Sequence, residues 1–367
     1  MRSRRGLKIV FALNSYGLGH ATRSLPLIQA AVSAGYTVYV IAFGRSLAFL
    51  RRELGGGVTK YFELPDYSFS RVFSRKGFSS RKFFLISPLF IYEAQVEHKT
   101  FLRLNRQYRF DIVVSDSRFG IYLPDKPSYL LSNQLKHSIR KLPFFAALFT
   151  ERYMHRVKKN FTKVIVPDTE QNPLSGKLTH NFWFFKPADI EYIGILSMLK
   201  HRKIRPDIDY FISISGPEPQ RTVFEQKITA SLDQLQGKKV VVTLGNPEKA
   251  GLREKRGALE IYGLLDRKKQ EEIMNRARLV VTRSGYSTVM DLAELEKKAL
   301  YIPTAGQPEQ EYLARYHKKL GHNYAVRLKK LNLARDLAIA ERYPGYKTSH
   351  KTADSVQKFL ALLKKNV

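Results

Sequence analysis

Short apolar runs alternate with longer amphipathic stretches along the first half of the chain. Between the first two runs, the apolar residues of 21–34 recur at helical spacing until Gly35. The runs are rich in β-branched residues and lie at 8–13, 37–43, 111–116, 128–133 and 163–168. Continuous apolar strands separated by helices are typical of a parallel sheet that is covered on both faces. The first half therefore predicts an α/β domain.

A second series of apolar runs begins after the polar, proline-containing stretch 199–209. Its predicted strands lie at 210–215, 239–244, 258–263, 278–283 and 298–303. A chain of 367 residues is also longer than one ordinary core supports. We therefore predict two doubly wound α/β domains, 1–195 and 196–350, and a C-terminal helix in 351–367 that packs back on the first domain. Open parallel sheets bind ligands at the carboxyl ends of their strands, so a cleft between the domains is the expected site.

Composition changes this picture in two respects. The chain has no cysteine, which excludes disulfides and thiolate metal sites and fits a reducing compartment. It carries 63 Lys and Arg against 32 Asp and Glu, a net charge of +31, so its surface should attract nucleic acid or an anionic membrane leaflet.

No run reaches the ~20 apolar residues of a membrane span, and no signal peptide is predicted. We expect a cytoplasmic protein that is peripheral on the inner face of the cell membrane.

The stretch NSYGLGHATRS, residues 14–24, joins the first predicted strand to the first predicted helix. Gly17 and Gly19 allow a tight turn and a close approach of substrate to the backbone, at a helix start that favours negative charge. The full dinucleotide fingerprint is absent, because Arg23 stands near the place of its third glycine and no acidic residue ends the second strand. A nicotinamide site is therefore disfavoured.

His20 in this turn is a candidate general base, since an ordinary imidazole titrates near neutral pH. Such a base needs an orienting carboxylate, and Asp116 at the end of the strand 111–116 could supply one. Two other interpretations remain open. His20 could only fill the turn, and Asp116 could cap the following helix.

The richest polar pattern of the second half follows the strand 278–283. Hydroxyls and backbone N–H groups at the start of a helix suit a diphosphate, and the candidates are Arg283, Ser284, Gly285, Ser287 and Thr288. Asp291, one turn into the same helix, suits a ribose. The alternative is an ordinary βαβ unit whose hydroxyls cap the helix.

Two more strand-end turns of this half carry polar groups. After the strand 298–303, Glu309 and Gln310 are hydrogen-bonding groups for a sugar. The turn SGPEPQR adds Gly216 and Arg221, and Arg221 could hold a phosphate or be one more surface arginine.

The segment 67–90 is predicted as a loop that interleaves basic and aromatic residues. Its predicted membrane contacts are Arg71, Phe73, Arg75, Lys76, Phe78, Arg81 and Lys82. Basic side chains attract anionic lipids while aromatic rings settle in the interface, which favours a membrane surface. Single-stranded nucleic acid is the competing partner, and a loop whose phenylalanines join the core is the plainest alternative.

The whole chain resembles a glycosyltransferase of the GT-B fold, in the UDP-sugar-dependent group with MurG-like and monogalactosyldiacylglycerol-synthase-like members and a family 28 C-terminal domain. The motifs that carry this resemblance are RSGYSTVMD, GQPEQEY, SGPEPQR and, less specifically, GLGHATRS. It implies two Rossmann-like domains that face each other across a cleft. The sequence departs from the family pattern in two places. Gly-Leu-Gly-His replaces a run of three glycines, and Asp291 replaces a glutamate.

The resemblance also implies roles for individual residues. The diphosphate would lie on Ser284, Gly285, Ser287 and Thr288. The ribose would lie on Asp291, and the donor sugar on Gln310 and less surely on Glu309 and Glu311. His20 with Asp116 would act beside the acceptor, near Gly17, Gly19 and Arg23.

The resulting hypothesis is an inverting, metal-independent transfer of a sugar from UDP-sugar to a lipid or lipid-linked acceptor at the membrane surface. No cofactor is expected, and the only Asp-x-Asp pair, Asp207 and Asp209, lies in the predicted linker. A UDP-sugar hydrolase or epimerase on the same fold is the first alternative. A non-catalytic, basic nucleic-acid-binding protein is the second, and it leaves the strand-end residues unexplained, so nucleic acid is not an expected partner.

Overall fold

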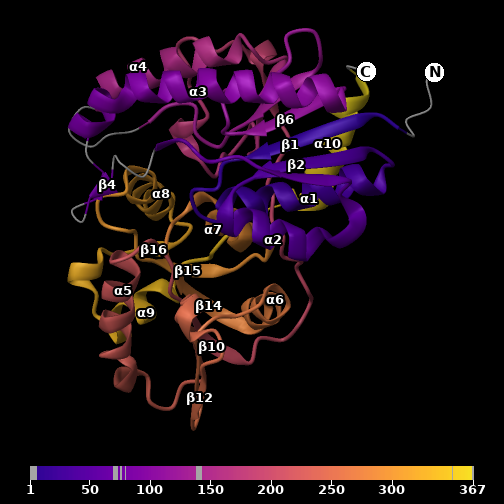
Figure 1. The fold of residues 1–367 in the computed structure, drawn as a ribbon. Coiled ribbons are helices and arrows are strands. Elements are labelled where there is room, and N and C mark those ends of the chain that lie inside the picture. Colours follow the sequence, from indigo (N-terminus) through magenta and orange to yellow (C-terminus); the bar gives the residue numbers. More distant parts are fainter. Residues whose placement is uncertain are drawn as a thin grey trace. The chain divides into compact units, whose positions relative to one another are not determined.

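The computed structural model describes residues 6–68, 73–74, 77–78, 80–137, 143–348 and 350–365. The chain divides into two compact units (Figure 1). The first contains most of the chain up to residue 198 together with the C-terminal helix, and the second contains residues 199–349. Each unit is described by itself.

The first unit is built on a seven-stranded parallel sheet. Its strand order is β3-β2-β1-β6-β7-β8-β9. The strands are β1 (Lys8–Leu13), β2 (Thr37–Ala42), β3 (Lys60–Glu63), β6 (Ile112–Asp116), β7 (Ser128–Leu131), β8 (Lys163–Val166) and β9 (Ile190–Tyr192). The chain moves from β1 to one edge and then resumes at β6 on the other side of β1. The switch point therefore lies between β1 and β6, where Leu13 pairs with Asp116.

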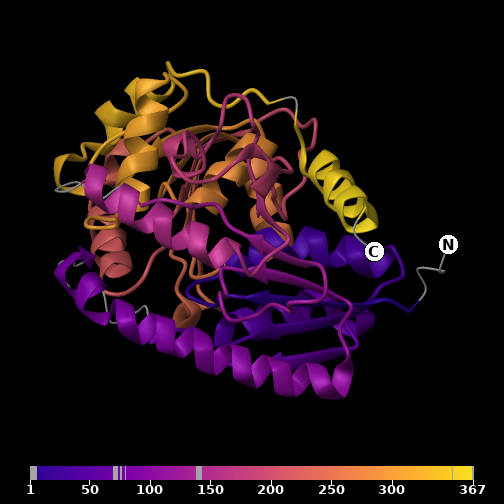
Figure 2. The ribbon, with the colours of Figure 1, turned by 90° about the horizontal axis from the view of Figure 1, so that it is seen from above.

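Helices cover both faces of this sheet. In Figure 1, α3 and α4 lie on one side of β1 and β6, and α1 and α2 lie on the other. The helices are α1 (Gly19–Ser33), α2 (Gly44–Leu54), α3 (Ser80–Tyr108), α4 (Pro143–Lys158) and α10 (Thr352–Lys365). Figure 2 shows α10 beside α1, and Phe359 of α10 lies 6.2 Å from the ring of Phe11 on β1. Two short strands, β4 (Phe73–Ser74) and β5 (Gly77–Phe78), form a separate sheet.

The second unit repeats the plan with one variation. Its sheet has the order β12-β13-β11-β10-β14-β15-β16, and only β12 is antiparallel to its neighbour. The strands are β10 (Ile208–Ser213), β11 (Val240–Thr243), β12 (Arg253–Arg256), β13 (Leu259–Tyr262), β14 (Ala277–Thr282), β15 (Lys298–Tyr301) and β16 (Tyr324–Ala325). The helices are α5 (Gln220–Thr229), α6 (Arg267–Arg276), α7 (Tyr286–Glu294), α8 (Pro308–Lys319) and α9 (Leu333–Ala340). Here the switch point lies between β10 and β14.

The predicted fold class is confirmed, because each unit is an α/β structure on a mostly parallel sheet. All ten predicted strands are present, with ends that differ by one or two residues. One expectation is wrong. The segment 67–90 was expected as a loop, but its residues from Ser80 onward are the first three turns of α3, with Pro88 inside the helix. None of the helices that the described residues form combines the length and apolar character needed to cross a membrane.

Candidate functional site

The switch point of the first sheet brings His20 and Asp116 together. His20 stands in the first turn of α1, directly after the glycine turn that follows β1, and Gly17 in that turn adopts φ +82°. Nδ1 of His20 lies 2.8 Å from Oδ1 of Asp116. The histidine side chain is 22% exposed and the aspartate side chain 2%. The imidazole is therefore reachable, while its carboxylate partner is buried behind it.

Besides His20, Arg23 and Ser24 also donate hydrogen bonds to Asp116. Arg23 donates from Nε to Oδ2 at 2.8 Å and from Nη2 to Oδ1, and the Ser24 hydroxyl donates to Oδ2 at 2.9 Å. Burial alone would raise the pKa of Asp116, but the charge of Arg23, the neighbouring His20 and these hydrogen bonds together hold that pKa well below its usual range. Asp116 is therefore ionised at neutral pH. The described residues 117–127 form no helix, so Asp116 is not a helix cap.

Ionisation of Asp116 decides which nitrogen of His20 carries the proton. Nδ1 of His20 also lies 2.9 Å from Nη2 of Arg23, and this nitrogen cannot donate to Asp116 and accept from Arg23 at the same time. An ionised carboxylate only accepts, so we assign the proton to Nδ1 in its contact with Asp116. In the neutral imidazole, Nε2 then keeps its lone pair.

Sequence reasoning placed Arg23 beside this pair but missed its contacts and the other outer partners, Ser24 and Asn133. Arg23, which is 3% exposed, donates from Nη1 to Oδ1 of Asn133, just beyond the end of β7. Ser24 ends the motif GLGHATRS, but neither its role nor that of Asn133 had a signal in the sequence. Only the side-by-side arrangement of β1, β6 and β7 brings them to Asp116.

A second buried network supports the same end of the sheet. Arg118, after β6, donates to Glu97 at 2.6 Å and to the carbonyl of Pro65 at 2.7 Å. Both carboxylate oxygens of Asp66 accept the N–H of Ser15, at 3.0 and 2.9 Å. Burial raises the pKa of Asp66, and the charge of Arg118 offsets this only in part. A strand-end Pro-Asp pair was the available signal, but the short β3 before it was not predicted.

In the second unit, the predicted diphosphate residues lie at the switch point between β10 and β14. Ser284 and Gly285 end the turn after β14, and Ser287 and Thr288 lie in the first turn of α7. The N-cap position of α7 is Gly285, which has no side chain to cap the helix. The arrangement leaves the positive end of a nine-residue helix beside the turn.

Arg283 is a scaffold residue rather than an open cation. Its guanidinium donates to the carbonyls of Gln220 at 2.9 Å, Ile302 at 3.0 Å and Ser215 at 3.3 Å. It also stacks 4.2 Å from the ring centre of Phe224. Burial lowers the pKa of Arg283 to about 10. Arg283 thus ties three strand-end loops together.

Arg221 is also occupied by internal contacts. Its Nε donates to Glu218 at 2.5 Å and its Nη1 to Glu225 at 2.5 Å, and its side chain is 9% exposed. The suggestion of a plain surface arginine is therefore wrong. A role on phosphate would require Arg221 to leave one of these two carboxylates.

The predicted sugar-binding residues begin α8, next to the same turn. Gln310 accepts the N–H of Thr304 at 2.9 Å through Oε1, and its carbonyl accepts the Ser284 hydroxyl at 2.8 Å. Glu311 accepts the N–H of Gly306 at 3.1 Å. Glu309, in the first turn of α8, and Asp291, in the second turn of α7, are half-buried. The structure therefore gathers these residues around one turn, while their roles stay predictions.

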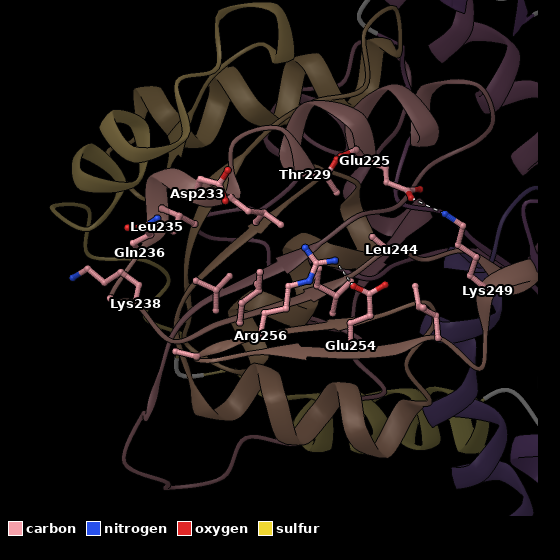
Figure 3. A pocket seen from close by; sticks show the side chains of 17 residues that line it. Glu225, Thr229, Asp233, Leu235, Gln236, Lys238, Leu244, Lys249, Glu254 and Arg256 are labelled. Carbon is pink, nitrogen blue, oxygen red and sulfur yellow. Dashed lines mark hydrogen bonds and ion pairs between the residues drawn. The ribbon is translucent and has the colours of Figure 1, made fainter.

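A hollow of about 610 Å³ lies elsewhere in this unit (Figure 3). Residues 244–258 connect the parallel neighbours β11 and β13 without an α-helix, so part of one sheet face is left uncovered. Aliphatic residues such as Leu235, Val240 and Leu244 line it, and the lining residues Glu254 and Arg256 form an ion pair. None of the residues predicted to bind the donor lines the hollow.

The predicted membrane contacts cannot be compared with the structure. Arg71, Arg75 and Lys76 lie outside the described residues, as do the side chains of Phe73, Phe78, Arg81 and Lys82. Another apolar surface of this unit is described. Phe144, Phe145 and Phe149 of α4 are each about half exposed or more, together with Trp183, whose ring lies 5.6 Å from that of Phe144. We call these four residues the aromatic patch.

The surroundings of the aromatic patch carry basic groups. Nζ of Lys136 lies 4.6 Å from the ring centre of Trp183, and Arg152 and Arg156 are exposed on α4. The only acidic residue of α4, Glu151, is fully buried and accepts the N–H of Trp183 at 2.6 Å. Within the described part of the chain, no three His, Asp or Glu side chains gather so that they could hold a metal ion.

Comparison with protein families gives two matches. Residues 220–361 match the C-terminal domain of glycosyltransferase family 28, and residues 7–172 match a glycosyl transferase family 1 model. The second of these spans β1, the glycine turn and Asp116. The first spans Arg221, α7 and α8. Among curated proteins, no sequence matches the chain.

Solved structures resemble the chain over nearly its whole length. The glycotransferase of kitacinnamycin is 14% identical, with 99% of this chain and 96% of that one covered and a TM-score of 0.63. MurG of Acinetobacter baumannii is 13% identical, with 98% and 99% covered and a TM-score of 0.59. The spinosyn rhamnosyltransferase SpnG, complexed with thymidine diphosphate, is 14% identical, with 98% and 96% covered and a TM-score of 0.60. At these identities the likeness shows a shared fold.

Proposed function

Since the chain is a glycosyltransferase of the GT-B fold and of the family 28 type, we propose that it transfers a sugar from UDP-sugar to a lipid or lipid-linked acceptor. Uridine as the base follows from the family resemblance. A nucleoside diphosphate as the carrier is supported by the thymidine diphosphate bound to SpnG. The proposed reaction inverts the anomeric carbon and uses no metal.

The observation that carries this proposal is the contact between His20 and ionised Asp116. With the proton of the neutral ring on Nδ1, Nε2 of His20 can take the proton of an acceptor hydroxyl. The hydroxyl oxygen then forms a bond to the anomeric carbon while the bond from that carbon to the diphosphate oxygen breaks. The diphosphate leaves with the electron pair. Asp116 keeps the ring oriented and stabilises the imidazolium that forms.

On the donor side, the start of α7 is proposed to hold the diphosphate. Backbone N–H groups and the helix dipole stabilise the negative charge that develops on the leaving oxygen. In other enzymes a bound metal ion stabilises this charge. Ser287 and Thr288 add hydroxyls, Asp291 is proposed to accept the ribose hydroxyls, and Gln310 to bind the sugar. Arg283 then acts through the scaffold, by fixing the loops around the site.

A lipid acceptor and attachment to the inner face of the cell membrane are supported by the surface of the first unit. The aromatic patch is exposed and has basic neighbours, and the whole chain carries a net charge of +31. Aromatic rings settle at a membrane interface, and each nearby basic residue adds about 1 kcal/mol on an anionic surface.

The test measures nucleoside diphosphate release by the purified protein across UDP-sugars and dTDP-sugars, with and without a membrane lipid extract. Release only with lipid supports the proposal and identifies the acceptor fraction. Release without any acceptor would make a hydrolase the better interpretation. His20→Ala should abolish turnover and keep UDP affinity, whereas Asp291→Ala should weaken UDP binding. Equal UDP affinity in Asp291→Ala and the wild type would contradict the donor site.

A further inference from the structure

Thr304 places a buried hydroxyl beside the proposed donor site. The residue follows β15 and is 3% exposed, yet Oγ1 finds no hydrogen-bond partner among the described residues. Its backbone is fixed, because its N–H donates to Gln310 and its carbonyl accepts from Gln307. A buried hydroxyl without a partner destabilises a fold, so the structure retains this one against a stability cost.

This hydroxyl faces the backbone at Gly216. A methyl group at Gly216 would lie 3.8 Å from Oγ1 of Thr304 and 3.9 Å from Nε of Arg283. Gly216 has φ +124°, a conformation that side chains other than glycine rarely adopt. The backbone at Gly216 therefore leaves room for a methyl-sized group beside Thr304 and Arg283, where β10, β14 and β15 end side by side, and we call this space the notch.

The electrostatics of the notch favour an anion. No carboxylate of the described residues forms an ion pair with Arg283, whose contacts are carbonyls and the ring of Phe224. The start of α7 follows β14 directly, and the side-chain amide nitrogen of Gln310 lies 3.9 Å from where a methyl group on Gly285 would stand. A buried cation and an unpaired hydroxyl thus border the notch, and Gly285, the N-cap of α7, follows the cation by two residues in the chain.

From this arrangement we infer that the Thr304 hydroxyl donates a hydrogen bond to a phosphate oxygen of the nucleoside diphosphate sugar. The inference rests on the proposed function and adds a residue to its donor site. Gly216 lets the phosphate approach the backbone, and Thr304 completes from β15 the site that α7 forms from β14. The ligand gives the hydroxyl the partner that it lacks in the free protein.

The test compares Thr304→Val, which removes the hydroxyl and keeps the shape, with Thr304→Ser, which keeps the hydroxyl. Calorimetric titration with UDP and with uridine is combined with thermal unfolding of the free proteins. For Thr304→Val we expect UDP affinity to fall about tenfold or more, uridine affinity to stay unchanged, and the unfolding midpoint to stay or rise. Thr304→Ser should keep most of the UDP affinity.

The results that would contradict the role of Thr304 differ from those that would contradict the proposed function. Unchanged UDP affinity in Thr304→Val would overturn the inference and leave the proposed function intact. Equal losses for UDP and uridine, together with a lower unfolding midpoint, would show a structural role and would also overturn it. A wild-type protein that binds neither UDP nor thymidine diphosphate would overturn the proposed function, and this inference with it.

Discussion

Arg23 donates two hydrogen bonds to Asp116, from Nε to Oδ2 at 2.8 Å and from Nη2 to Oδ1. Both side chains are almost completely buried, and Nη1 of the same guanidinium reaches Asn133. The carboxylate that orients His20 is therefore itself oriented by an arginine three residues along α1. A planar guanidinium can hold both oxygens at once, and a lysine cannot.

Arg23→Lys is accordingly expected to lower kcat by about 10²-fold, because a misplaced Asp116 misdirects His20. UDP affinity should not change, since the proposed donor residues belong to the second unit. The measurements are kcat and UDP titration on the same preparation. Arg52→Lys, an exposed arginine of the same unit, is the control. A wild-type kcat in Arg23→Lys would show that the paired contact is not needed for turnover.

The sequence predicted the local parts of this site and not the distant ones. His20, Gly17 and the helix behind them follow from one strand-turn-helix stretch, whose signals lie within a few residues of each other. Asp116 could be proposed as a partner because parallel strands end at one edge of a sheet. Asn133 and Arg118 could not, because their contacts depend on strand order and on which side chains fill the space between loops.

The same distinction applies to the second unit. Arg283 follows β14 and Arg221 lies in the first turn of α5, where a phosphate ligand is a reasonable prediction, and that role stays a prediction. The sequence did not predict that their guanidinium groups are bound by Glu218 and Glu225 in one case and by backbone carbonyls in the other. β12, with the sequence REKR, has no apolar residue, since it is an edge strand held by its antiparallel pairing with β13.

Gly263 should not tolerate a side chain. A methyl group there would lie 1.6 Å from the carbonyl oxygen of Lys249, in a loop whose backbone is fixed by hydrogen bonds from Gly263 to Leu252 and from Asn246 to Gly263. Gly263→Ala is therefore expected to lower the free energy of unfolding by about 1–3 kcal/mol or more. Urea denaturation followed by circular dichroism measures this change.

Gly251, in the loop between β11 and β12 that contacts Gly263, is the matched control. A methyl group there meets no atom within 4 Å, so Gly251→Ala should be neutral or stabilise the protein by about 0.4–1 kcal/mol. Equal destabilisation by the two substitutions would mean that these positions require glycine for flexibility rather than for space.

Buried His137 should make the free energy of unfolding depend on pH. Burial lowers the pKa of its imidazole to about 4, whereas the unfolded chain has a pKa near 6.5. Between these values the unfolded state binds a proton that the folded state does not, so lowering the pH favours unfolding. From pH 7 to pH 5 this group should remove about 2 kcal/mol of stability.

In His137→Gln, the free energy of unfolding should therefore fall less between pH 7 and pH 5 than in the wild type. Urea denaturation at both pH values measures the difference. His201→Gln, which changes an exposed histidine, should keep the wild-type dependence. The argument would be wrong if both variants lost stability in parallel with the wild type.

The aromatic patch predicts binding to anionic membranes. Phe144 and Phe145 are 55% and 69% exposed at the start of α4, and their rings can enter the interface while Arg152 and Arg156 meet the head groups. The double substitution Phe144→Ser with Phe145→Ser should reduce sedimentation with phosphatidylglycerol vesicles by about tenfold, since each ring contributes on the order of 1 kcal/mol at the interface. Leu320→Ser, which removes a 48% exposed apolar side chain of the second unit, should leave sedimentation unchanged. Equal binding of the double variant and the wild type would exclude the patch as the membrane contact, and strong binding to neutral vesicles would contradict the part assigned to the basic residues.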